Sequence, residues 1–312
     1  MEWYFVFLIV LLILAGVVFI ISVAAGIVAG NIVARPKGIN RLTFEQVRRI
    51  QTKLGSVDYD AYDAMEKESF LLRREDGVEL ACEFLPNPEG AEKCLIYVHG
   101  FSQNRLIGVR FLSVFREMGY SALIFDQRGF GESGGFCGFG YFEKHDLAAL
   151  VEWVRSRMGE DVLIGLVGES MGAITILESL DVLDGIAFAV PDSSCSSVYS
   201  MFSALTKLPA FPVFSIMNLV VRIRFGVNLK SVRPVDRVAG TDMPIMFMHG
   251  TADPQIKVSE CPKLFAAARN PLSRMELFEN SAHCMGHVDY TERYEGALRE
   301  FVVEAERVFN EQ

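Results

Sequence analysis

The stretch VLIGLVGESMGAITILESL, residues 162–180, largely determines the architecture of this chain. It opens with an apolar run, Val162–Val167, that has the length and composition of a buried β-strand. From Met171 onward a second apolar run has the length of a helix. The turn between them, Gly168–Gly172, must therefore pass sharply from a strand into a helix. Such a turn strains the backbone at its centre, Ser170, and glycines on both sides avoid side-chain collisions across it.

The turn Gly168-Glu169-Ser170-Met171-Gly172 also matches the pattern G-x-S-x-G. In this context a serine hydroxyl is exposed at the start of a helix, whose free N–H groups stabilise developing negative charge. The bare five-residue match can arise by chance in a glycine-rich loop. The strand before it, the helix after it and the partners downstream favour a chemical role, so we predict Ser170 as a nucleophile.

A serine nucleophile needs a base, and that base needs an acid to orient it. In sheets of this kind the chain order is serine, acid, histidine. Asp253 follows the predicted strand Ile245–His249, and His283 follows the predicted strand Met275–Phe278. Both residues lie in loops at the carboxyl ends of strands, so we predict Asp253 as the acid and His283 as the base.

Two other residues compete for these roles. His287 lies four residues beyond His283 and is the alternative base. Asp192 follows the predicted strand Ile186–Val190 and is the alternative acid. An aspartate before a loop more often caps or hydrogen-bonds a turn, and we expect that role for Asp192.

The oxyanion formed during acyl transfer needs two backbone donors. We predict the N–H of Met171, directly after the nucleophile, and the N–H of Phe101, in the loop after the strand Cys94–His99. His99 itself precedes the glycine that lets this loop bend, and we expect a structural role for it. The glycine-rich run Asp126–Ser133 matches neither common phosphate-loop pattern, so we expect it to support neighbouring loops.

Strands and helices alternate from the predicted strand Cys94–His99 onward, which predicts an α/β fold with a mostly parallel central sheet and helices on both faces. A hairpin around Gly77 precedes it. Residues 193–232 break the alternation, because they are long, apolar and interrupted by Pro209 and Pro212. We interpret them as an inserted helical cap. A second membrane span is the alternative, and the two prolines and Lys207 argue against it.

The N-terminal segment carries no charged residue from Trp3 to Ala34. This run is longer than the roughly 20 apolar residues that are needed to cross a bilayer. A cleaved signal peptide is the alternative, but such peptides have a positive start and a shorter apolar core. We predict one transmembrane anchor (1–35), a juxtamembrane connector (36–68) and a catalytic domain with its cap (69–312). Positive residues follow the helix and place that domain in the cytoplasm: Arg35, Lys37, Arg41, Arg48, Arg49 and Lys53.

Charge and cysteine content limit the functional classes. The net charge of −9 argues against general binding to nucleic acid or anionic lipid by the domain as a whole. None of the six cysteines forms a CxxC pair or a zinc-like cluster, so we expect free thiols, and no metal or cofactor.

Together these motifs resemble the α/β-hydrolase superfamily over about residues 66–310. The resemblance rests on His99-Gly100-Phe101, the Asp126–Ser133 run, Gly168–Gly172, His249–Asp253 and Ser281-Ala282-His283. Within the superfamily the chain is most similar to bacterial membrane-anchored or exported serine hydrolases of the Bem46 type. This resemblance implies a triad of Ser170, Asp253 and His283, with Phe101 and Met171 as oxyanion donors.

The activity expected from these residues is hydrolysis of a small-molecule or lipid-like acyl ester through an acyl-enzyme on Ser170. The apolar cap and the anchor favour a lipophilic ester, although a cap is also apolar where it packs on its domain. The same triad would serve an acyltransferase or a serine peptidase, because fold does not specify substrate. A non-catalytic membrane-associated binding protein is a further alternative. The oligomeric state leaves no signal in the sequence.

Overall fold

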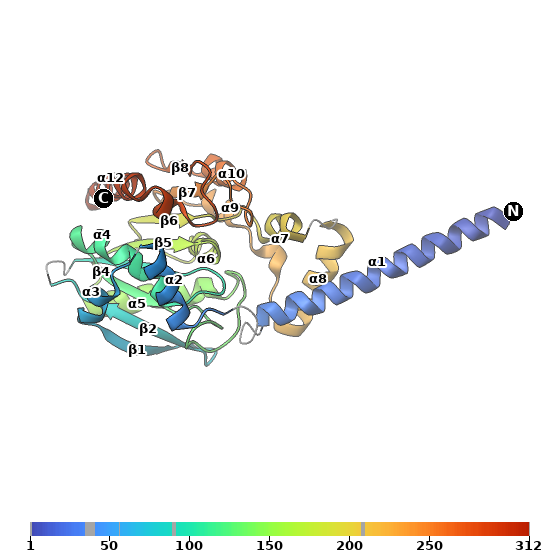
Figure 1. Cartoon of the computed structure of the whole chain (residues 1–312), viewed down its shortest axis with the longest axis horizontal. Coiled ribbons are helices and arrows are strands. Elements are labelled where there is room, and N and C mark those ends of the chain that lie inside the picture. The colour runs from blue at the N-terminus through green and yellow to red at the C-terminus, as the bar shows by residue number, and fades with distance from the viewer. Residues whose placement is uncertain (1, 35–40, 56, 89–91, 207–209, 312) are drawn as a thin grey trace.

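The computed structural model describes residues 2–34, 41–55, 57–88, 92–206 and 210–311. Arg35 and Lys37 of the positive flank, and Lys207 and Pro209 of the expected cap, lie outside these ranges. One long helix, α1 (Glu2–Ala34), extends away from a body that contains the sheet (Figure 1).

The body is built on one mixed sheet. Its strands within the described residues are β1 (Glu68–Arg73), β2 (Glu79–Leu85), β3 (Lys93–Val98), β4 (Ser121–Phe125), β5 (Leu163–Glu169), β6 (Phe188–Asp192), β7 (Met246–Gly250) and β8 (Arg274–Phe278). They lie in the order β1-β2-β4-β3-β5-β6-β7-β8. β2 pairs antiparallel with β1 and β4, and the other neighbours are parallel. The predicted hairpin and the mostly parallel sheet are confirmed.

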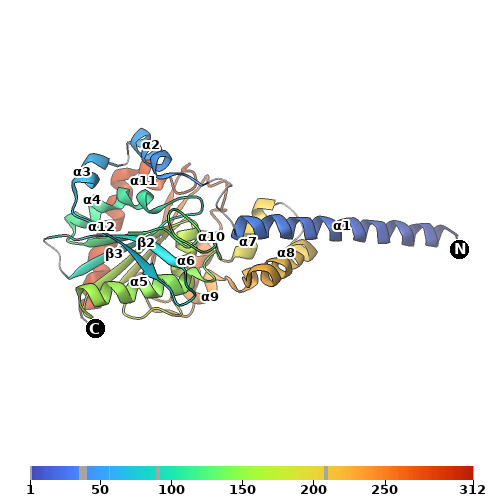
Figure 2. The same ribbon diagram turned by 90° about the horizontal axis from the view of Figure 1, so that it is seen from below.

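Helices cover both faces of this sheet (Figure 2). They are α2 (Phe44–Leu54), α3 (Tyr59–Ala64), α4 (Leu112–Glu117), α5 (Glu143–Met158), α6 (Met171–Ser179), α9 (Pro234–Val238), α10 (Glu260–Ala267), α11 (Gly286–Asp289) and α12 (Thr291–Asn310). Side chains of α2, α3, α4 and α12 pack on one face, together with Leu95 and Tyr97 of β3. Those of α5, α6, α9 and α10 pack on the other, with Ile96. This alternation buries the central strands on both sides and explains their apolar runs.

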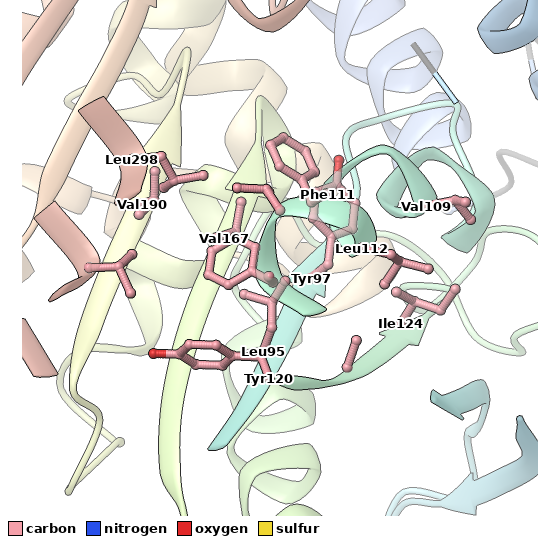
Figure 3. Packing of buried hydrophobic residues seen from close by; sticks show 14 of the residues in the cluster. Leu95, Tyr97, Val109, Phe111, Leu112, Tyr120, Ile124, Val167, Val190 and Leu298 are labelled. Atoms are coloured by element: carbon pink, nitrogen blue, oxygen red, sulfur yellow. The ribbon is translucent and has the colours of Figure 1, made fainter. Parts of the chain in front are cut away.

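The first of these cores is rich in large side chains (Figure 3). The rings of Tyr97 and Phe111 stack with centroids 5.3 Å apart. Here the structure corrects one prediction, because the expected helix Leu106–Met118 begins as a 3₁₀ helix, η1 (Arg105–Phe111), and only then becomes α4. Gly108 lies against the Tyr97 ring, where a Cβ would collide, and glycine is a poor former of α-helix.

The described part of the expected connector, residues 36–68, packs onto the body. Thr43 caps α2 in a capping box with Gln46. The Leu42 N–H donates to the Ser102 carbonyl (2.9 Å), and Val47 of α2 is 1% exposed. Helix α2 is therefore fixed beside the loop that follows β3.

The insertion between β6 and β7 contains two helices, α7 (Val198–Thr206) and α8 (Ala210–Phe225), and a short 3₁₀ turn, η2 (Leu229–Ser231). It lies at the end of the body nearest α1, and α8 contacts α1, crossing it obliquely in Figure 1 and lying beside it in Figure 2. Among the described residues, one helix is by itself long and apolar enough to cross a membrane, over Trp3–Val28.

Candidate active site

Ser170 occupies the tight turn between β5 and α6, at the carboxyl edge of the sheet. Its backbone angles, φ 52° and ψ −117°, lie in a region that residues with a side chain rarely adopt. Its N–H donates to the Asp192 carbonyl (2.8 Å), and its own carbonyl accepts from the Ile174 N–H (3.0 Å). The neighbouring strand and helix thus hold the strained residue in place.

Gly172 lets α6 pass directly over the end of β3. A Cβ there would lie 2.6 Å from the Val98 carbonyl carbon and 2.8 Å from the His99 oxygen, both rigid backbone atoms. We expect Gly172→Ala to lower the free energy of unfolding by about 1–3 kcal/mol and to displace Ser170, with loss of turnover. Gly296→Ala in α12 is the control, since no atom lies within 4 Å of its Cβ position. Thermal unfolding of both variants checks this, and equal effects would contradict it.

Asp253 and His283 meet at the same edge of the sheet. The Nδ1 of His283 lies 2.6 Å from Oδ2 of Asp253. Oδ1 of Asp253 accepts from the N–H groups of Gln255 (2.7 Å) and Ile256 (2.9 Å). Burial alone would raise the pKa of Asp253, but hydrogen bonds from His249 and His283 hold it well below its ordinary value. Asp253 is therefore an ionised acceptor that orients His283.

The competing residues occupy other surroundings. His287 is buried between the rings of Phe111 and Tyr294, with centroids 6.1 and 6.0 Å away. Burial lowers the pKa of His287 to about 2, so it is a neutral part of the core. Asp192 accepts from Ser193 Oγ (2.9 Å) and from the Tyr294 hydroxyl (3.1 Å). It thus hydrogen-bonds a turn, as expected, and it also contacts α12 through Tyr294.

A cavity of about 390 Å³ brings the predicted nucleophile and base together, since both Ser170 and His283 line it. Phe101 lines it as well, and its ring stacks on Phe139 at 5.6 Å. Met171 begins α6 next to Ser170, where helix N–H groups have no acceptor within the helix. Much of the remaining lining is apolar and comes from α2 and the segment before it: Leu42, Val47, Ile50 and Leu54, with Gln51 as a polar member.

Sequence reasoning missed four charged or titratable residues that line this cavity or contact residues of the site. Glu169 and Arg110 line it as a buried ion pair, and the Tyr97 hydroxyl donates to the same carboxylate. A charged residue at the end of an apolar strand, as Glu169 is, signals a buried partner. Nothing local identifies Arg110. His249 ends β7, and its Nε2 donates to the Ile256 carbonyl (2.9 Å) and lies 3.4 Å from Oδ2 of Asp253.

The neighbouring loops have the supporting roles that we expected. Burial lowers the pKa of His99 to about 4, and its Nε2 accepts from the Gln127 N–H (2.8 Å). Asp126 holds Arg105 through an ion pair of 2.6 Å and accepts from the Glu132 N–H (2.9 Å). The six cysteines are free. Within the described residues no group of His, Cys, Asp or Glu is arranged to hold a metal ion.

The sequence is similar to a known family and to bacterial proteins. Residues 44–215 match the family model described as X-Pro dipeptidyl-peptidase (S15 family). The chain is 26% identical over 287 residues to the uncharacterized protein YqkD of Bacillus subtilis (strain 168), covering 90% of this chain and 92% of that protein. It is 28% identical over 256 residues to the uncharacterized protein YfhR of Salmonella typhi, covering 76% of this chain and 80% of that one.

Solved structures agree on the fold. The Pyrococcus furiosus esterase Pf2001 matches with a TM-score of 0.64 at 22% identity, over 81% of this chain and 95% of that one. Est1E from Butyrivibrio proteoclasticus, solved with ferulic acid bound, matches with a TM-score of 0.58 at 20% identity, over 76% and 98% of the two chains. The predicted α/β-hydrolase fold is confirmed.

Proposed function

The chain belongs to the X-Pro dipeptidyl-peptidase (S15) family, and from this premise we propose that it is a membrane-anchored serine hydrolase that cleaves carboxylic (acyl) esters. One observation carries the proposal. His283 is hydrogen-bonded to the ionised Asp253 and shares a cavity with Ser170, whose strained turn exposes its hydroxyl. A nucleophile, a base and an orienting acid are the groups that acyl transfer requires.

The chemistry follows from these positions. His283 donates its Nδ1–H to Asp253, so its Nε2 is free to accept the proton of the Ser170 hydroxyl as the oxygen attacks the acyl carbonyl carbon. The N–H groups of Phe101 and Met171 stabilise the oxyanion. His283 then passes the proton to the leaving alkoxide. Water, activated by the same histidine, releases the acid from the acyl-enzyme.

The lining of the cavity favours an ester with an apolar acyl group over a peptide. A dipeptidyl-peptidase must recognise the positive amino end of its substrate, for which a free carboxylate is the natural partner. Among the described lining residues Glu169 is the sole carboxylate, and it is already paired with Arg110. Near α2 the lining is mainly aliphatic, at Leu42, Val47 and Ile50, and the polar residue of α2 that joins it, Gln51, is uncharged.

Turnover of matched chromogenic substrates tests this proposal. We expect kcat/KM for p-nitrophenyl esters to rise with acyl length by up to about fourfold per methylene, or about 0.8 kcal/mol, until the cavity is full. An X-Pro p-nitroanilide should be turned over far more slowly than any of these esters. A preference for the anilide would instead assign peptidase activity to the site.

The anchor and its orientation are part of the proposal. Helix α1, which has no charged residue after Glu2, would cross the bilayer, and the positive residues that follow it, such as Arg48 and Arg49, favour a cytoplasmic hydrolase domain. Protease added to intact cells should then leave this domain uncut, and cleavage would place it outside.

A further inference from the structure

Helix α1 is not uniformly exposed. Its apolar side chains from Trp3 to Ile21 are open on the surface, whereas three small residues at intervals of four are buried: Ser22, Gly26 and Gly30. Their common spacing places them on one face of the helix. Small residues at this spacing are the pattern by which membrane helices approach one another closely.

The cap helix α8 occupies this face. A Cβ on Gly26 would lie 3.0 Å from the Met217 Cα and 3.1 Å from the Val220 Cβ. A Cβ on Gly30 would lie 2.8 Å from Cε2 of Phe225. These contacts leave room for hydrogen only, so the cap is docked on the anchor itself.

The order of the contacts along the two helices shows how far α8 extends along α1. Gly26 faces Met217 and Gly30 faces Phe225, so the two helices run in the same sense. The first turns of α8 therefore extend up to about 10 Å beyond this contact, at 1.5 Å per residue, away from the body and toward the middle of the span Trp3–Val28. Figures 1 and 2 both show α8 in this position, separated from the sheet by α7.

The free side of α8 has the character of a lipid-facing surface. Leu219 and Ile223, one turn apart, are 54% and 78% exposed, and Ile223 is the most exposed large apolar side chain of the described residues. The charged residues of the helix are Arg222 and Arg224, both in its last turn nearest the body. Leu219 lies one turn further from the body than Ile223, which lies between the two arginines. The long side chains of these arginines, and that of Lys230, whose Nζ donates to Ser215 Oγ (3.0 Å), would reach toward the headgroups while the apolar pair contacts acyl chains.

Aromatic rings connect this helix to the active site. Phe101 of the cavity stacks on Phe139, which contacts Phe202 of α7 at 5.7 Å, and Phe202 lies 6.3 Å from Phe214 of α8. An apolar layer therefore continues from α8 to the cavity wall.

We propose that α8 is a membrane-embedded element of the cap, held on α1 by the Ser22–Gly26–Gly30 face and contacting lipid acyl chains through Leu219 and Ile223. The active site then receives an ester that resides in the bilayer. This inference rests on the proposed anchor and esterase activity, and it commits the exposed face of α8 to lipid rather than to a second copy of the chain.

Fluorescence quenching tests the position of α8. The full chain is placed in phosphatidylcholine vesicles with and without brominated acyl chains. A Trp3→Phe background keeps Trp153, which is packed against Phe70 in the body, as an unquenched internal reference. We expect Leu219→Trp to lose fluorescence to the brominated lipid. Val303→Trp, on the exposed side of α12, should lose none.

The outcomes separate the two proposals. If Trp3 of the unmodified chain is not quenched, the anchor fails. If Trp3 is quenched but Leu219→Trp behaves like Val303→Trp, the anchor stands and α8 lies outside the bilayer. Cross-linking between chains at position 219 in that case would assign the face to a second copy and overturn the inference.

Ester turnover by α8 variants tests whether the substrate reaches the active site from the bilayer. Leu219→Glu puts a charge on the lipid face of α8, so we expect turnover of a long-chain ester dissolved in the vesicles to fall about tenfold. Turnover of soluble p-nitrophenyl acetate should not change. Val303→Glu is the matched control. If Leu219→Glu lowers turnover of both substrates equally, or lowers neither, the ester is not supplied from the membrane. If the unmodified chain turns over no ester at all, the proposed esterase activity is wrong.

Discussion

Ser170→Ala is expected to lower kcat for ester hydrolysis by about a million-fold, the size of loss that removal of a serine nucleophile causes in other hydrolases. Alanine fits the same turn, because the strained backbone is held by Asp192 and Ile174 and not by the hydroxyl. The variant should therefore fold, bind the ester and fail to form the acyl-enzyme. Covalent labelling with a fluorophosphonate, followed by steady-state kinetics, measures both effects.

A second serine provides the control. Ser203 lies on α7, away from the cavity that contains Ser170, and Ser203→Ala should keep its labelling and its rate. Persistent labelling and turnover in Ser170→Ala would mean that another residue is the nucleophile, and the proposed mechanism would be wrong.

Asp253→Asn is expected to lower kcat by about 10⁴-fold while the fold is kept. Oδ1 of Asp253 accepts from two backbone N–H groups, so the asparagine oxygen will take that place. Its amide nitrogen then faces Nδ1 of His283, where the carboxylate oxygen was. As a donor it forces the proton of His283 onto Nε2, so the imidazole cannot accept the proton of Ser170.

Asp192→Asn is the matched comparison, because Asp192 is also a buried carboxylate at the end of a neighbouring strand. Its partners, Ser193 and Tyr294, are hydroxyl groups that can rotate to suit an amide. We expect its kcat to change little. A large loss in Asp192→Asn together with a small loss in Asp253→Asn would reverse the assignment of the acid.

The local pattern of apolar residues was sufficient to predict the positions of several strands of the sheet. The predicted strands Val162–Val167 and Met275–Phe278 differ from β5 and β8 by one or two residues at an end. Each is an apolar run closed by a turn, and burial on both faces makes such a run hard to satisfy in another way. The 3₁₀ start at Arg105–Phe111 was not predictable, because it depends on contact with Tyr97 from another strand.

In the candidate site, too, some features follow from local sequence and others from tertiary packing. The turn around Ser170 is recognisable because its strand, glycines and helix are contiguous in the chain. The choice between His283 and His287 is different, since both follow the same strand. Only packing separates them: the loop turns His283 toward Asp253 and buries His287 between two rings.

The amino-acid sequence by itself determined the alternation of strands and helices, the long apolar helix at the N-terminus and the serine turn, because each is specified by neighbouring residues. Only the tertiary structure decided that α2 forms a wall of the cavity, that Arg110 pairs with Glu169 beside the serine, and that α8 lies on the glycine face of α1. These contacts join surfaces far apart in the chain, and their free energy depends on complementary shape and charge that no local pattern encodes.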